Sequence, residues 1–297
     1  MSHTDSDPGE SAFVDAGAVT LHVRRAGPPD GPPVVLLHGF PEFWFGWRRQ
    51  LRALAEAGYR VLAPDQRGYN RSGKPRGVAA YGLDSLARDV AGLLDSEGHE
   101  RAAIVGHDWG AVVGWWLGMA YPGRVERLAV ANGPHPGAMG DALLGSWRQR
   151  LRSVYTLAAQ PPWLPEAALR ARNYALLTRV LTDTSRPGTF EESALERYRR
   201  AWGRPGALTG MLNWYRAAGR GFGTYRRHDR VTVPTLVLWG SDDSALGPGL
   251  ADDSAALCDD VRLRRFDATH WVHHERPDAV TEALVGFLPG APPSKSF

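Results

Sequence analysis

The 297-residue sequence contains a single cysteine, Cys258, and only two lysines. One cysteine cannot form an intramolecular disulfide, so the fold does not depend on an oxidising compartment, and we expect Cys258 to be a small packing residue. No apolar stretch approaches the roughly 18 uncharged residues of a membrane-spanning helix. The first ten residues lack the basic start and apolar centre of a signal peptide, so we expect a cytoplasmic protein.

The sequence also has little net charge. Lysine and arginine number 35 against 32 acidic residues, which leaves a formal net charge of +3. The basic residues form no tract, so the composition indicates neither a nucleic-acid nor a membrane partner. Hydrophobic residues make up 43% of the chain, which is ordinary for a globular protein. This length suits one catalytic domain, with or without an inserted lid.

Short apolar runs alternate with helical patterns along the first part of the chain. The regular alternation predicts an α/β fold with a doubly wound, mostly parallel central sheet flanked by helices. The expected strands are 13–14, 19–23, 33–37, 60–65, 102–105 and 125–130, and the expected helices are 47–58, 83–94 and 111–121.

The strand pattern disappears after this part of the chain. Between residues 135 and 230, arginine, tryptophan, tyrosine and leucine recur at helical spacing, and strands resume at 233–239 and 261–266. A helical block between two strands of one sheet is expected to form a lid. We therefore predict a core domain in two parts, 1–134 and 231–297, interrupted by a helical cap at 135–230.

The segment Gly106-His107-Asp108-Trp109-Gly110 lies between a predicted strand and a predicted helix. It matches the nucleophile-elbow pattern, in which small residues flank the nucleophile, with aspartate in the place of the more usual serine. Glycines avoid Cβ clashes in so tight a turn. The pattern alone is more often structural than catalytic, but its place between strand and helix favours Asp108 as a nucleophile.

A nucleophile of this kind needs a base, and the base needs an acid that orients it. In folds with a nucleophile elbow, the chain order is nucleophile, acid, histidine. Here Asp242 and Asp243 end one predicted strand and His270 follows the last one. The carboxyl ends of parallel strands meet at one edge of the sheet, where ligands bind. The order therefore favours a catalytic triad of Asp108, His270 and one of the two aspartates, Asp242 or Asp243.

His38-Gly39-Phe40-Pro41 follows the first core strand. Backbone N–H groups of Phe40 and Trp109 would form the oxyanion hole of such a site.

Five segments of the sequence fit one known family. They are HGFPEFWFGWRRQ from His38, APDQRGYNRSGKP from Ala63, GHDWGA from Gly106, LVLWGSDD from Leu236 and THWVHHERPD from Thr269. Over about residues 13 to 288 the chain resembles the soluble epoxide hydrolases of the α/β-hydrolase superfamily. The resemblance implies that fold with its inserted helical cap, Asp243 as the acid of the triad, and no cofactor or metal. One departure is Asn70, where the family commonly has glycine; asparagine tolerates the same left-handed backbone.

The resemblance also implies two cap tyrosines that hold the epoxide oxygen. The segment Leu212-Asn213-Trp214-Tyr215-Arg216 points to Tyr215, and Tyr155 stands five residues before Gln160, which precedes a proline. Ala158 and Ala159 replace bulkier family residues, so we expect extra room near Tyr155.

In the mechanism that the resemblance implies, Asp108 opens an epoxide and forms an alkyl ester. Tyr155 and Tyr215 would supply a proton to the ring oxygen. His270, oriented by Asp243, would then activate water to hydrolyse the ester and release a vicinal diol.

We expect the substrate to be an apolar or aryl epoxide, because aromatic side chains would line the cavity. The residues expected there are Phe40, Trp109, Trp163 and Trp214. His38 and Glu42 are assigned supporting roles, Glu42 in placing the hydrolytic water. His107, His273 and His274 are interpreted as structural or surface residues, and no His/Cys cluster has the spacing of metal ligands.

Two other functions remain open from the sequence. A haloalkane or haloacid dehalogenase would use the same Asp108 and His270, but a departing halide needs no proton from tyrosine. A binding protein on an inactive hydrolase scaffold is disfavoured, because all three triad candidates are present.

Overall fold

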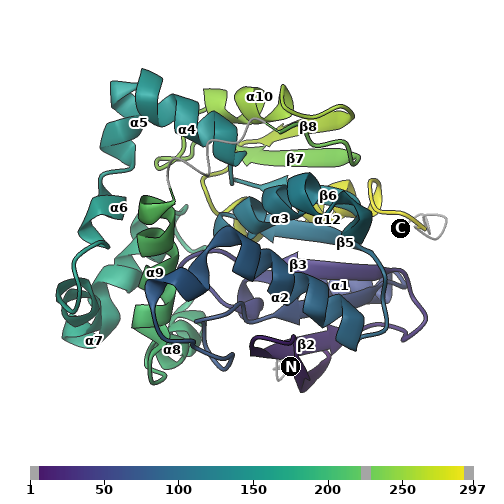
Figure 1. Cartoon of the computed structure of the whole chain (residues 1–297), viewed down its shortest axis with the longest axis horizontal. Coiled ribbons are helices and arrows are strands. Elements are labelled where there is room, and N and C mark those ends of the chain that lie inside the picture. The colour runs from purple at the N-terminus through teal and green to yellow at the C-terminus, as the bar shows by residue number, and fades with distance from the viewer. Residues whose placement is uncertain (1–6, 222–228, 291–297) are drawn as a thin grey trace.

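The computed structural model describes residues 7–221 and 229–290. Eight strands form one sheet in the order β1-β2-β4-β3-β5-β6-β7-β8 (Figure 1). The strands are β1 Glu10–Asp15, β2 Thr20–Ala26, β3 Pro33–Leu37, β4 Arg60–Pro64, β5 Ala102–His107, β6 Val125–Ala131, β7 Thr235–Gly240 and β8 Val261–Phe266. Three parts of the predicted domains lie outside the described residues: 1–6, 222–228 and 291–297.

The sheet is parallel from β4 to β8, and only β1 and β2 run against their neighbours. The central strands β5 and β7 have every residue buried, which explains why they are continuous apolar runs in the sequence. The prediction of a mostly parallel sheet flanked by helices is confirmed.

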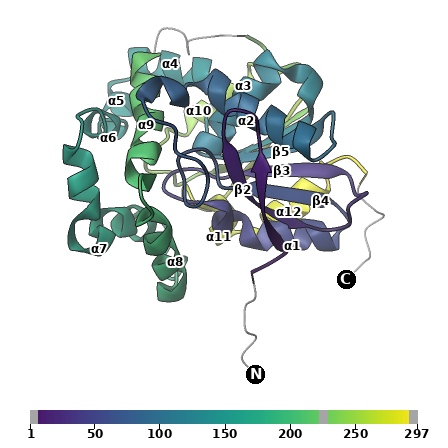
Figure 2. The ribbon, with the colours of Figure 1, turned by 60° about the horizontal axis from the view of Figure 1, so that its bottom comes forward.

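Helices cover both faces of the sheet. Figure 2 shows α2 and α3 on one face, and α1 and α12 on the other. These helices are α1 Arg48–Glu56, α2 Leu83–Ser96, α3 Trp109–Ala120 and α12 Pro277–Val285. Two shorter helices, α10 Gly249–Ala255 and α11 Val272–Glu275, and three 3-10 turns, Trp44–Trp47, Val78–Tyr81 and Pro122–Arg124, complete the core. Cys258 is buried, as expected of a packing residue.

A helical insertion separates β6 from β7. Its helices are α4 Pro136–Gly145, α5 Trp147–Arg152, α6 Tyr155–Ala158, α7 Leu164–Asp183, α8 Glu192–Trp202 and α9 Ala207–Arg220. Helix α7 is interrupted over residues 171–174, where three successive residues have positive φ. In the part of the chain that is described, no helix is both long and apolar enough to cross a membrane. The insertion lies over the carboxyl ends of the strands (Figure 1).

Candidate active site

Asp108 lies between β5 and α3 with φ 49° and ψ −118°. So tight a turn requires the glycines on either side of it. A Cβ at Gly106 would lie 2.3 Å from the carbonyl oxygen of Gly110, and a Cβ at Gly110 would lie 2.1 Å from that of Leu37. The backbone strain at Asp108 is therefore held by close contacts with its surroundings, as in a nucleophile elbow.

His270 joins Asp108 to Asp243. Its Nε2 lies 3.6 Å from Oδ1 of Asp108, and its Nδ1 lies 2.7 Å from Oδ2 of Asp243. The amide nitrogen of Asn132 donates to the same Asp243 oxygen at 2.8 Å. Asp242 instead points outward and pairs with Arg186 at 3.3 Å. The geometry thus distinguishes two neighbouring aspartates that sequence order alone left equivalent.

The two carboxylates control the charge of His270. Burial alone would lower the pKa of His270, but Asp243 and then Asp108 outweigh it and raise this pKa to about 9. Burial would likewise raise the pKa of Asp243, but His270 and Asn132 hold it below its usual value. At neutral pH the arrangement therefore favours an imidazolium between two carboxylates.

The loop after β3 supplies a backbone donor to Asp108. The N–H of Phe40 donates to Oδ2 of Asp108 at 3.0 Å. Buried His38 fixes this loop: its Nε2 accepts from the N–H of Gln66 at 3.0 Å, and its Nδ1 lies 3.0 Å from the carbonyl oxygen of Gly39. Since Nε2 accepts, Nδ1 carries the proton. Burial lowers the pKa of His38, which suits this neutral form.

A cavity of about 750 Å³ opens above Asp108. Tyr155 and Tyr215 both line it, and their ring centroids are 6.0 Å apart. Most other lining residues are apolar and come from α3, α4 and the segment 151–157. Tyr155 is 47% exposed because it faces this open space, whereas Tyr215 is wedged edge-on between Phe40 and Trp109.

Both tyrosines keep their protons over the whole physiological range. Although nearly half of Tyr155 is exposed to the open cavity, desolvation of its hydroxyl by the surrounding protein, reinforced by Asp108 and Asp243, raises the pKa of Tyr155. Burial, with Tyr155 and Asp108, raises that of Tyr215 well above its usual value. Two neutral O–H groups thus share a cavity with one carboxylate.

Three of the four aromatic residues expected around the cavity do not form its wall. Trp163 is 82% exposed, with φ 61° just before α7, and points into solvent. Trp214 is 1% exposed; its indole N–H donates to the carbonyl oxygen of Arg67 at 3.0 Å, behind Trp109. Phe40 packs against Tyr215. Trp109 does line the cavity.

The extra room expected near Tyr155 does not come from the two alanines. Ala159 is buried against Leu212 and Tyr215, and Ala158 is exposed. Neither residue lines the cavity.

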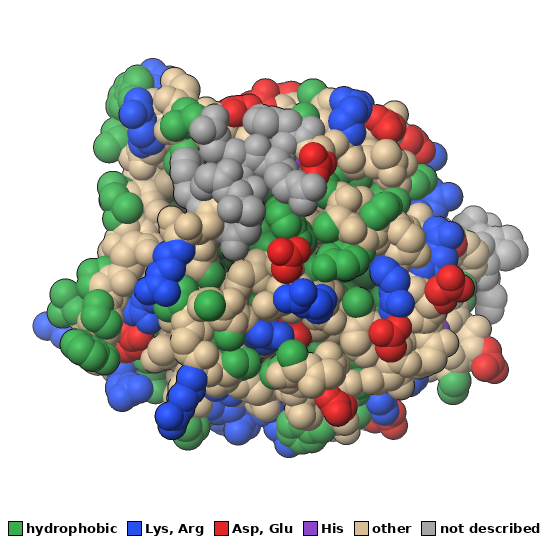
Figure 3. Space-filling view, in the orientation of Figure 1, with side chains coloured by type: hydrophobic (Ala, Val, Ile, Leu, Met, Phe, Trp, Pro, Cys, Tyr) green, Lys and Arg blue, Asp and Glu red, His purple; other side chains and the backbone are tan. Residues whose placement is uncertain are grey.

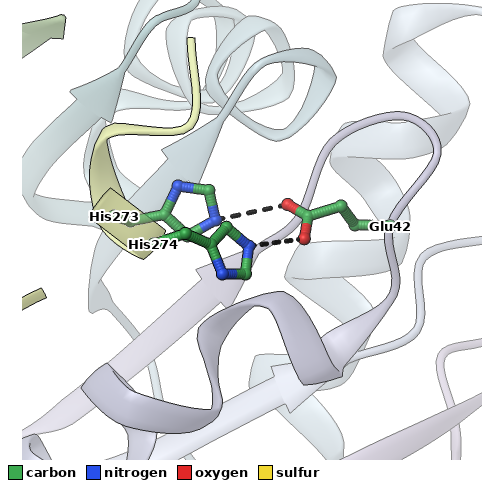
Figure 4. Close-up of side chains that lie close together, drawn as sticks. All are labelled: Glu42, His273 and His274. Carbon is green, nitrogen blue, oxygen red and sulfur yellow. Dashed lines mark hydrogen bonds and ion pairs between the residues drawn. The ribbon is translucent and has the colours of Figure 1, made fainter. Parts of the chain in front are cut away.

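Glu42 lies at the centre of a buried polar cluster. Figure 4 shows His273 and His274 of α11 facing the carboxylate of Glu42, which lies on the loop after β3. Nε2 of His274 lies 2.7 Å from Oε1, Nε2 of His273 lies 3.2 Å from Oε2, and the hydroxyl of Tyr198 donates to Oε1 at 2.5 Å. Glu42 is 1% exposed. It is not among the residues that line the cavity. Its supporting role in placing the hydrolytic water stays a prediction.

His107 links this cluster to His270. Its Nε2 lies 3.0 Å from the carbonyl oxygen of His270, and its Nδ1 lies 3.6 Å from Oε2 of Glu42. Burial alone would raise the pKa of Glu42, but the facing histidines, His274 foremost, hold it well below its usual value. Burial lowers the pKa of both His273 and His274. His107, His273 and His274 are all buried. Of the two roles predicted for them from the sequence, structural or surface, only the structural role fits.

The same cluster is the one group of three potential metal ligands in the described ranges. The ligand atoms of Glu42, His273 and His274 lie within 4.8 Å of one another. Sequence spacing did not indicate the group because its halves are over 200 positions apart. Hydrogen bonds among these residues already satisfy the carboxylate, so its burial needs no ion to explain it.

Glu42→Gln is expected to lower the free energy of unfolding by about 1–3 kcal/mol, because an amide nitrogen would face histidine and tyrosine donors in a buried site. Urea unfolding measures the change. Glu56→Gln, at an exposed position of α1, is the matched control and should stay within about 0.5 kcal/mol of wild type. Equal effects of the two substitutions would contradict a stabilising cluster.

The loop after β4 behaves as its sequence indicates. Asn70 adopts φ 36°, so asparagine does supply the left-handed backbone there. Its amide donates to buried Asp65, and Arg67 forms a buried ion pair with Asp89. Asp65 and Arg67 hold the loop in place.

Comparisons with known proteins identify the family of the chain. A family model described as the α/β-hydrolase fold matches residues 32–277. YfhM of Bacillus subtilis, an AB hydrolase superfamily protein, is 43% identical over 93% of this chain and 96% of its own. Epoxide hydrolase A of Mycobacterium tuberculosis is 35% identical, and the match covers 94% of this chain and 97% of that protein.

The chain belongs to the epoxide hydrolase family of α/β hydrolases. A solved family structure, a mutant epoxide hydrolase of Bacillus megaterium with its product, a naphthyloxy-propane-1,2-diol, has a TM-score of 0.83 and 27% identity. The match covers 93% of this chain and 99% of that one. The family fold and its cap, inserted between β6 and β7, are therefore those expected from the sequence.

Proposed function

We propose that this enzyme hydrolyses apolar or aryl epoxides to vicinal diols through a covalent ester on Asp108. The observation that carries the proposal is the meeting of Asp108, Tyr155 and Tyr215 at one apolar cavity. A carboxylate alone would suit several reactions. Two neutral phenols opposite a carboxylate suit the opening of a strained ether, whose leaving oxygen needs a proton.

In the first step, a carboxylate oxygen of Asp108 attacks an epoxide carbon and the carbon–oxygen bond of the ring breaks. The electron pair of that bond goes to the ring oxygen. Tyr155 and Tyr215 hydrogen-bond this oxygen and one of them transfers its proton to it, since an alkoxide is too basic to form unaided. Positioned acid assistance of this kind contributes about 10²–10⁴-fold.

In the second step, His270 removes a proton from water, which attacks the carbonyl carbon of the Asp108 ester. Asp243 orients the imidazole and stabilises the imidazolium that forms. The oxyanion develops beside the N–H groups of Phe40 and Trp109, where each donor contributes about 3 kcal/mol. When the tetrahedral intermediate collapses, the ester carbon–oxygen bond breaks and the leaving alkoxide takes the proton held by His270. The new carboxylic acid of Asp108 returns its proton to the tyrosinate, so release of the diol leaves the carboxylate, the neutral imidazole and both tyrosines restored.

The proposed substrate class follows from the cavity wall. Its lining is mostly apolar, with Val112, Met139, Leu143 and Leu151 among its residues, and Arg150 and Arg220 also line it. The volume of about 750 Å³ is ample for an aryl group. The naphthyl product in the Bacillus megaterium structure is a ligand of the same kind in a protein of the same family.

Phenylalanine in place of Tyr155 or Tyr215 is expected to lower kcat for diol formation by about 100-fold each, because the leaving oxygen loses a proton donor. Diol formation is measured on styrene oxide, with halide release from chloroalkanes and fluoroacetate beside it. Tyr174→Phe, a cap tyrosine that packs against Trp202, is the control and should retain wild-type kcat.

Halide release without diol formation, unaffected by either substitution, would instead identify a dehalogenase. In that reaction Asp108 and His270 keep their tasks, and the tyrosines only pack.

A further inference from the structure

The large apolar side chains that the fold leaves exposed are concentrated in one segment. Of eleven such side chains among the described residues, ten lie between positions 144 and 180, and the other is Phe13. Trp163, Leu164 and Trp147 are 82%, 70% and 61% exposed. Scattered exposed apolar residues are ordinary, but a concentration of this kind marks an interaction surface.

The same segment is strongly basic. Between residues 144 and 180 there are six arginines and one acidic residue, Glu166. Glu166 is already paired with Arg216 of α9 at 2.8 Å. Arg148, Arg170 and Arg179 are among the arginines that are exposed. The small net charge of the whole chain, which argued against a membrane partner, therefore conceals a local excess of positive charge.

These residues share one side of the molecule. Figures 1 and 2 both place α5, α6 and α7 along the outer border of the cap, away from the sheet. Figure 3 shows hydrophobic and basic side chains together along that border. We name residues 144–180 the cap edge. Leu151, Val154 and Leu157 are both exposed and part of the cavity wall, so the cavity opens within the cap edge.

We propose that the cap edge docks on anionic phospholipid membranes, without crossing them. Trp147, Trp163 and Leu164 enter the boundary between headgroups and acyl chains, where tryptophan is favoured. Arg148 and Arg170 pair with lipid phosphates. A second copy of the chain fits less well, because a twofold contact would bring like-charged arginines together.

Docking gives the cavity a direct entrance from an apolar phase. Apolar molecules concentrate in the membrane, and they would reach the cavity past Leu151 and Val154 without crossing water. The binding itself does not depend on the proposed reaction, because it is measured on the protein without turnover.

Sedimentation with lipid vesicles tests the proposal. We expect the protein to bind vesicles that contain phosphatidylglycerol and to bind phosphatidylcholine vesicles hardly at all. Binding to the phosphatidylglycerol vesicles should weaken as the salt concentration rises. Substituting Arg148, Arg170 and Arg179 by glutamine should lower the partition coefficient roughly 100-fold, at about fivefold per arginine. The control substitutes glutamine for three exposed arginines outside the cap, Arg88, Arg101 and Arg264. This triplet changes the net charge by the same amount and should lower the partition coefficient less than about fivefold.

The apolar contribution has its own matched pair. Trp147→Ser should weaken vesicle binding about tenfold, whereas Phe13→Ser, at a comparably exposed site on β1, should not weaken it. Thermal melting checks that all variants remain folded. The proposal is overturned if wild type binds no vesicles, or if both arginine triplets lose binding equally. A solution dimer that Trp147→Ser dissociates, with no vesicle binding, would also overturn it and make the cap edge a protein interface.

Discussion

Alanine in place of Asp108 is expected to lower kcat/KM for diol formation by at least about 10⁴-fold, because the proposed reaction then has no nucleophile. The tyrosines and the backbone donor at Phe40 remain in place, so direct attack by water is the only route left. Chromatographic assay of the diol from styrene oxide, at high enzyme concentration, measures the residual rate.

The loss should come from chemistry rather than from folding. The strained backbone at Asp108 is held by contacts of Gly106 and Gly110, which do not involve the carboxylate. We therefore expect Asp108→Ala to keep its melting temperature within a few degrees and its affinity for the diol product within a few-fold. Diol formation at more than about a tenth of the wild-type rate would eliminate Asp108 as the nucleophile.

The sheet could be predicted from the sequence because buried parallel strands are continuous apolar runs with clear ends. Strand β8 was predicted with its observed bounds, 261–266, and β3 likewise at 33–37. Each triad candidate follows such a strand, so the topology alone brings Asp108, Asp243 and His270 to one edge. Chain order left Asp242 and Asp243 equivalent; the family resemblance pointed to Asp243, and the contacts of His270 agree with that choice.

The cap was predicted as helical, but not the directions of its side chains. Trp163 follows two prolines and adopts a left-handed φ, which turns its ring outward. Helix α7 is interrupted at 171–174 without a proline or glycine to announce it. Periodicity reports which residues are apolar and not what they face, so Trp163 and Trp214 were assigned to the cavity wrongly.

The Glu42 cluster was missed for a different reason. Glu42 and His273 are 231 positions apart, and no spacing rule connects them. A signal was nevertheless present: two adjacent histidines closely follow His270, and Glu42 directly follows the HGFP segment. Polar residues so near two catalytic motifs are candidates for a shared network, which the fold then buries.

Glutamine in place of His270 is expected to separate the two chemical steps. Ring opening needs only Asp108 and the tyrosines, so the variant should form its ester and then stall without a base. Steady-state diol formation should fall by at least about 10⁴-fold, since loss of a catalytic histidine elsewhere costs about 10⁶-fold. Intact-protein mass spectrometry should detect the enzyme with one added epoxide. A variant that is slow yet never carries this added mass would contradict a covalent mechanism.

The two aspartates beside β7 provide the matched control for the second step. Asp243→Asn should accumulate the same ester, because asparagine cannot stabilise the imidazolium, whereas Asp242→Asn should behave as wild type, since its carboxylate faces solvent and Arg186.

The pH dependence of ester hydrolysis has a definite sign. The pKa of His270 is raised to about 9 partly by ionised Asp108, and ester formation removes that charge. Ester hydrolysis in wild type should therefore rise with pH and level off with an apparent pKa below 9. A rate that falls as pH rises would show that His270 is not the base.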